Sequence, residues 1–158
     1  VPYHGGFGLL NIHGIPKPSY RAFQMLSKLN GDKLEAAADK ENTTVDCTAS
    51  RNSEGITVLL TNHNVPKAPI EAEKVSILLK GLKNVQSVSV QRIDETHSNP
   101  KRAWVEMGSP TYLDNEQIQA LIDASELKSE TADWSAIDEG VKIELTIQPH
   151  SAVAITVK

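Results

Sequence analysis

The chain has 158 residues, a formal net charge of −4 and 39% hydrophobic residues. This length fits one domain, or one domain with an attached segment. The acidic balance argues against a nucleic-acid or anionic-lipid surface, and no apolar run approaches the roughly 20 residues of a membrane span, so we expect neither partner.

The first 31 residues predict a glycine-rich loop followed by an amphipathic helix. The loop, VPYHGGFGLLNIHG, lacks the spacing of a phosphate-binding turn, so its glycines indicate a tight backbone path. In IPKPSYRAFQMLSKLNG, proline in front and glycine behind are typical of helix ends. The helix has one broad apolar face that needs a partner surface, formed by Tyr20, Phe23, Met25, Leu26 and Leu29.

Residues 34–108 read as a succession of strands. GITVLLTNHN, EKVSILLKGL and VQSVSVQRID are rich in β-branched residues, which favour strands. Val75, Ile77 and Leu79 alternate with polar residues, as in an antiparallel strand with one buried face. The single cysteine, Cys47, lies in TTVDCTAS, which predicts a strand and a small side chain that is buried or half-buried.

Residues 109–158 predict a short helix and two closing strands. In LDNEQIQALIDAS, Asp114 stands at the N-cap position and Gln117 follows three residues later, which is a capping-box pattern. The last two apolar stretches each alternate with polar residues and flank QPHS, so we expect them to form a hairpin.

These elements predict a mainly β fold, an antiparallel β-sandwich with an N-terminal helix and one inserted short helix. The histidines lack the spacing of a metal pair and no HExxH motif occurs, so we expect no metal site and no cofactor. Aromatic residues make up only 4% of the chain, which weakens a sugar-binding platform without excluding one. Asn42-Thr43-Thr44 fits the glycosylation sequon, a triplet that is common by chance.

Two segments of the chain carry a family resemblance. HGGFGLLNIHGIPKPSYRAFQML is the more specific, RIDETHSNPKRAWVEMGSP is the second, and a helix, ASEL and the closing strands follow in order. Together they resemble the C-terminal part of glycoside hydrolase family 39, the β-xylosidases, over almost the whole chain. The resemblance implies a (β/α)8 barrel followed by a β-sandwich accessory domain.

The resemblance also implies a division of the chain. Residues 1–31 would be the last βα loop and the eighth helix of the barrel, and residues 32–158 the β-sandwich. The family is a retaining hydrolase whose two catalytic glutamates lie upstream of the segment matching Val1, so we assign no catalytic residue here. Because βα loops form the active face of a barrel, His4 and Phe7 are the candidate sugar contacts at the substrate rim.

One dipeptide looks catalytic but has a simpler explanation. Asn followed by Glu marks the acid/base residue of many barrel glycosidases. Asn115-Glu116, however, lies in the first turn of a predicted helix, where an acidic side chain stabilises the helix dipole.

The favoured function is a non-catalytic region of a β-xylosidase-type enzyme that hydrolyses xylo-oligosaccharides, with the catalytic barrel as its partner. Two alternatives stay open: a free-standing carbohydrate-binding module, and a β-sandwich that docks a protein through its first helix. Sugar specificity stays open, because family 39 also includes α-L-iduronidases, and so does the oligomeric state. We expect a soluble bacterial protein, cytoplasmic or secreted, and the missing initiator Met favours a truncated or processed chain.

Overall fold

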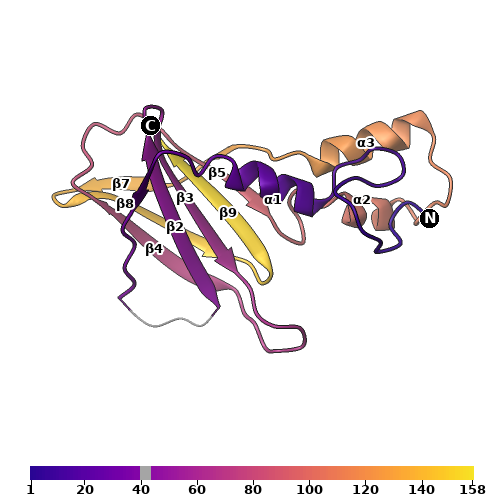
Figure 1. Ribbon diagram of the computed structural model, residues 1–158, viewed down its shortest axis with the longest axis horizontal. Coiled ribbons are helices and arrows are strands. Elements are labelled where there is room, and N and C mark those ends of the chain that lie inside the picture. The colour runs from indigo at the N-terminus through magenta and orange to yellow at the C-terminus, as the bar shows by residue number, and fades with distance from the viewer. Residues whose placement is uncertain (40–43) are drawn as a thin grey trace.

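In the computed structural model, two antiparallel sheets form one end of the molecule, and helices form the other (Figure 1). The structure describes residues 1–39 and 44–158, so Asn42 and Thr43 of the sequon lie outside the described residues. The expected mainly β fold with an N-terminal helix is confirmed. Among the described residues, no helix is long and apolar enough to cross a membrane.

The larger sheet has six strands in the order β1-β2-β3-β9-β5-β6. Their bounds are Asp32–Leu34, Val45–Asn52, Gly55–Asn62, Ser151–Val157, Val88–Ile93 and Glu130–Thr131. The β2–β3 hairpin turns at Gly55, whose φ of 139° and whose approach to the Val157 carbonyl leave no room for a side chain.

The smaller sheet has three strands in the order β4-β8-β7, with bounds Glu73–Lys80, Gly140–Ile147 and Trp134–Ile137. Val75, Ile77 and Leu79 of β4 face the core, as their alternation predicts. The sandwich core lies between the two sheets and contains a dozen buried side chains: Ala49, Ile56, Val58, Leu60, Val88, Val90, Val141, Ile143, Ile147, Val153, Ile155 and Val157.

The predicted closing hairpin is wrong. β8 belongs to the smaller sheet and β9 to the larger one, so the chain crosses between sheets at residues 148–150. His150 lies in this turn, where its side chain is exposed and its φ is 51°. Alternation records which face of a strand is buried, and both strands bury a face in the same core, so the pattern could not distinguish a hairpin from a crossing.

The first helix, α1, spans Pro18–Leu26 and lies on the outer face of the larger sheet. Met25 is buried there against Leu59, Ile93 and Ala154, and Ala22 and Leu29 pack beside it. Phe23 and Leu26 remain 61% and 49% exposed. The broad apolar face expected for this helix is therefore divided between a covered side and an open side.

Two further helices form the helical unit, α2 at Pro100–Glu106 and α3 at Asn115–Ser125. Only α3 was expected; its capping box is present, with Asp114 Oδ1 2.8 Å from the Gln117 backbone nitrogen. Glu116 lies in its first turn, as expected. The missed helix, α2, has Asn99 as its N-cap and Pro100 at its start, a pattern typical of helix starts.

Cys47 lies in β2, as predicted, but its side chain is exposed. The buried residues of this strand are Ala49 and Ser50, so the core does not extend to the cysteine. Partial burial nevertheless raises the pKa of the Cys47 thiol, which disfavours a reactive thiolate.

Candidate functional site

The N-terminal loop, residues 1–17, is folded on itself beside the helical unit (Figure 1). The Asn11 side-chain oxygen accepts hydrogen bonds from the backbone N–H groups of His13 and Ile15, at 2.9 and 3.0 Å. The Lys17 N–H donates to the Leu9 carbonyl at 2.8 Å. These local bonds give the loop a defined path without a regular helix or long strand.

The two candidate rim residues lie on the outermost part of this loop. Phe7 is fully exposed, and His4 is exposed with its Nδ1 accepting a 3.1 Å hydrogen bond from the Gly6 N–H. Gly5 and Gly8 have φ of 79° and 95°, which fits the expected tight backbone path. The structure therefore exposes both side chains, and His4 has the Gly6 N–H as a local hydrogen-bond partner.

Lys17 holds the backbone on which Phe7 stands. Its ammonium group donates to the Gly6 carbonyl at 2.9 Å and to the Phe7 carbonyl at 3.2 Å. Sequence reasoning missed this residue, because a lysine bonded to main-chain oxygens has no side-chain motif.

A second contact fixes the start of the loop to the helical unit. The Tyr3 ring lies 5.6 Å from the Trp104 ring, centroid to centroid and tilted by 48°. Beneath them Ile15 and Leu121 are fully buried, and Trp104 Nε1 donates to the Pro110 carbonyl at 2.9 Å. Burial raises the pKa of Tyr3 to about 12, because the phenolate form loses its solvation among these side chains.

Several polar atoms of the loop are buried without a hydrogen-bond partner among the described residues. They are the Tyr3 hydroxyl, the Asn11 amide nitrogen and His13 Nε2. An unpaired buried polar atom costs free energy. All three atoms lie within residues 3–13, inside the packing of the loop.

The helical unit is also attached to α1. Arg21 Nε donates to the Ser125 carbonyl at 2.7 Å, and Arg21 Nη2 donates to the Ser125 hydroxyl at 3.0 Å. Arg21 Nη1 bonds Gln24 at 2.8 Å within the same helix. The end of α3 is thereby held against α1, and the two helices form one frame for the loop.

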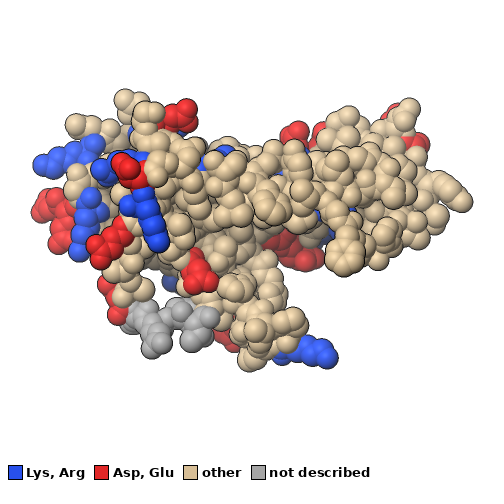
Figure 2. All heavy atoms as spheres, in the orientation of Figure 1, with Lys and Arg blue, Asp and Glu red and all other residues tan. Residues whose placement is uncertain are grey.

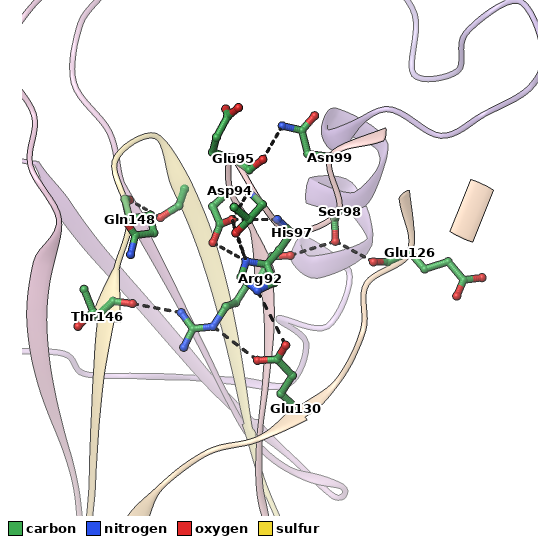
Figure 3. Close-up of polar contacts among 12 residues, drawn as sticks. Arg92, Asp94, Glu95, His97, Ser98, Asn99, Glu126, Glu130, Thr146 and Gln148 are labelled. Carbon is green, nitrogen blue, oxygen red and sulfur yellow. Dashed lines mark hydrogen bonds and ion pairs between the residues drawn. The ribbon is translucent and has the colours of Figure 1, made fainter. Parts of the chain in front are cut away.

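A second polar cluster lies where β5 ends (Figure 3). The Asp94 side chain is 3% exposed; its Oδ1 accepts from the backbone N–H groups of Thr96 and His97 at 2.8 and 2.9 Å, and lies 2.8 Å from His97 Nδ1. Burial alone would raise the pKa of Asp94, but the hydrogen bonds from Thr96 and His97 outweigh it and lower this pKa.

The neighbours of Asp94 join separate elements. Arg92 donates to the Thr146 carbonyl at 3.1 Å, and its Nε lies 4.0 Å from Glu130, drawn beside it in Figure 3. The Ser98 hydroxyl lies within hydrogen-bonding distance of the Arg92 and Glu126 carbonyls, at 3.0 and 2.9 Å.

A groove of about 890 Å³ runs beside this cluster, between α1 and the β8–β9 turn. Because Asp94 accepts hydrogen bonds from the loop that follows it, the cluster is better suited to holding the link between β5 and α2 than to acid–base chemistry. No cluster of three His, Cys, Asp or Glu that could hold a metal occurs within residues 1–39 and 44–158.

Comparison with known proteins gives consistent matches. The sequence profile described as "Glycosyl hydrolases family 39" matches residues 1–140. A beta-xylosidase from Caldicellulosiruptor saccharolyticus is 53% identical over 159 residues, which is 100% of this chain and 33% of the relative. A beta-xylosidase from Geobacillus stearothermophilus is 26% identical over 122 residues, 77% of this chain and 23% of the relative.

A solved structure agrees with these matches. The crystal structure of a monomeric beta-xylosidase from Caulobacter crescentus CB15 has a TM-score of 0.83 and 25% identity, covering 100% of this chain and 34% of that one. The chain thus spans about a third or less of the length of the proteins it matches.

Proposed function

The chain belongs to glycosyl hydrolase family 39, and from that premise we propose that it is the non-catalytic part of a retaining, β-xylosidase-type glycosidase. In that enzyme, residues 1–31 complete a (β/α)8 barrel and residues 32–158 form a sandwich that buttresses it. The names of the relatives support xylo-oligosaccharides as the substrate class. The proposal assigns no catalytic residue to this chain.

The observation that carries the proposal is the apolar surface of the first 26 residues. Seven large hydrophobic side chains there are at least 40% exposed: Val1, Phe7, Leu9, Leu10, Ile12, Phe23 and Leu26. In Figure 2, Lys and Arg gather at the sandwich end, while the visible surface over α1 is mostly uncharged. So many exposed hydrophobic residues in one short segment support an extensive apolar partner, as a barrel would provide.

Two carboxylates of this chain have structural roles. Retaining glycosidases place two carboxyl groups about 5–5.5 Å apart across the scissile bond. Asp94 is bonded to its own loop, and Glu116 stands in the first turn of α3. We therefore assign neither of them to a catalytic pair, and we keep His4 and Phe7 as the proposed contacts at the substrate rim.

The test compares the 158-residue chain with the full gene product on an aryl xyloside. We expect the full gene product to release nitrophenol and the isolated chain to release none, while a cooperative thermal transition shows that the isolated chain is folded. Nitrophenol release by the isolated chain would contradict the proposal. Calorimetric titration with xylo-oligosaccharides adds a second arm, since millimolar or tighter binding by the isolated chain would favour a carbohydrate-binding module instead.

A further inference from the structure

We propose that Lys17 and Trp104 are positioning residues that hold the loop of His4 and Phe7 at the substrate rim. The helical unit then contributes to substrate binding, because it supplies Trp104, one of the two anchors. This inference rests on the proposed function, since it requires a sugar site at the barrel face beside residues 1–8.

The first anchor is Lys17, which forms hydrogen bonds to the loop through both its backbone and its side chain. Its backbone N–H donates to the Leu9 carbonyl, and its ammonium group donates to the carbonyls of Gly6 and Phe7. Lys17 is also the N-cap residue of α1, so the position of its backbone is set by the start of the helix. Hydrogen bonds from a charged donor are stronger than those between neutral groups, and here two of them meet consecutive carbonyls.

The second anchor is Trp104, which acts through Tyr3. The Tyr3 ring packs on Trp104, and Tyr3 directly precedes His4, so this contact limits where the histidine side chain can start. The indole cannot turn freely, because its Nε1 donates to the Pro110 carbonyl. Ile15 and Leu121, both fully buried, complete the packing beneath the two rings.

The loop needs anchors because it has little packing of its own. Phe7 is fully exposed, so only its backbone determines where the ring stands. Gly5 and Gly8 give that backbone more conformational freedom than other residues would, and this freedom must be lost on binding. Holding the loop beforehand reduces this cost and strengthens binding.

The position of the helical unit supports this role. Its buried cluster of Ile15, Trp104 and Leu121 is separate from the sandwich core and includes a residue of the N-terminal loop. Arg21 joins the end of α3 to α1, so both anchors belong to one frame. The helical unit therefore packs against the loop while contributing nothing to the core between the sheets.

The experiment measures KM and kcat of the full gene product for xylo-oligosaccharides after Lys17→Met and Trp104→Phe. Each change should raise KM about 3- to 10-fold and change kcat less than about 2-fold, because binding is weakened while the catalytic carboxylates are untouched. Lys17→Arg keeps charged donors and should restore most of the wild-type KM. A purely structural role would lower the melting temperature and leave KM unchanged.

The chain offers a matched control for each change. Lys80 is an exposed lysine at the end of β4, and Trp134 is a tryptophan on β7 in the smaller sheet, so Lys80→Met and Trp134→Phe should leave KM unaltered. Wild-type KM values for Lys17→Met and Trp104→Phe in an active full gene product would overturn the inference alone. A native full gene product that fails to cleave the xyloside would overturn the proposed function itself. If Trp104→Phe does not fold, Lys17→Met decides, because Lys17 lies outside the buried clusters.

Discussion

The sandwich end and the helical end of this molecule differ in how many of their hydrophobic side chains are buried. In the sandwich, two sheets from the same chain cover each other and bury a dozen apolar side chains between them. At the helical end, the buried cluster consists of three residues, Ile15, Trp104 and Leu121, and many apolar side chains of the N-terminal loop stay exposed. The sandwich therefore encloses most of its apolar side chains, whereas the N-terminal loop leaves many of its own in contact with solvent.

α1 shows the difference within a single helix. Met25 is 1% exposed against the larger sheet, while Phe23, two residues away, is 61% exposed. Two residues along an α-helix are separated by about 200° of rotation, so Met25 and Phe23 lie on nearly opposite faces of α1. The larger sheet covers the face of Met25, and the face of Phe23 stays open.

The largest expected effect is in the sandwich core. Ile143 is fully buried in β8, and Ile143→Ala should lower the free energy of unfolding by about 3–4 kcal/mol, through lost burial and the cavity left behind. Urea denaturation measures the change. Ile137→Ala, at a 42% exposed position on β7, is the matched control and should cost under about 1 kcal/mol. Equal losses would mean that the two sheets do not enclose the core described.

The helical end should respond locally to a similar change. Leu121 is fully buried in α3, and Leu121→Ala should destabilise the helical unit by about 2–3 kcal/mol. Limited proteolysis should then cut residues 100–125 and the N-terminal loop faster, while the sandwich fragment survives. Collapse of the sandwich at the same urea concentration as the helical unit would show that the two ends are one cooperative body.

The segment that links β5 to α2 contains the Asp94 cluster, and its contribution to stability should depend on pH. The pKa of Asp94 is lowered in the folded state, so its stabilising contribution is present above the unfolded pKa of about 3.9 and is lost as pH falls through the folded value. Asp94→Asn should therefore lower the free energy of unfolding by about 1–2 kcal/mol at pH 7. Below about pH 4 this difference should shrink.

The control for this cluster is Glu95→Gln, at an exposed neighbouring carboxylate. It should change stability by less than about 0.5 kcal/mol at either pH. A difference between Asp94→Asn and wild type that stays constant from pH 7 down to pH 3 would contradict the assigned role of the ionised carboxylate.

The smallest effect on stability is expected at the open face of α1. Phe23→Asp should change the free energy of unfolding by less than about 0.5 kcal/mol, because the side chain packs little within this chain. Its effect should appear in association: light scattering should show the isolated chain forming dimers or larger species, and Phe23→Asp shifting it to monomers. A monomeric parent chain would mean that this face is not adhesive.

The sequence predicted individual helices and strands better than it predicted which strands pair with each other. The strand alternation in β4 and the capping box of α3 depend on residues close in the chain, and both are present. The β8–β9 hairpin was wrong because pairing depends on which sheet each strand joins. α2 was missed because seven residues show too little periodicity, although Asn99-Pro100 marked its start.

The candidate site was predictable only in part. A family resemblance drew attention to His4 and Phe7, and the structure places both on an exposed loop. Neither anchor could be found in this way. Lys17 bonds main-chain carbonyls, and Trp104 meets Tyr3 across about a hundred residues of sequence, so both contacts arise from the tertiary fold.

The most direct measurement is amide hydrogen exchange along α1 in the isolated 158-residue chain and in the full gene product. If residues 1–31 complete a barrel, the amides of Phe23 and Leu26 should exchange roughly 100-fold more slowly in the full gene product, because a covered helix opens less often. Amides in β3 and β9, at the centre of the larger sheet, should exchange at similar rates in both proteins. Equal exchange along α1 in the two proteins would contradict the claim that this face is buried against a barrel.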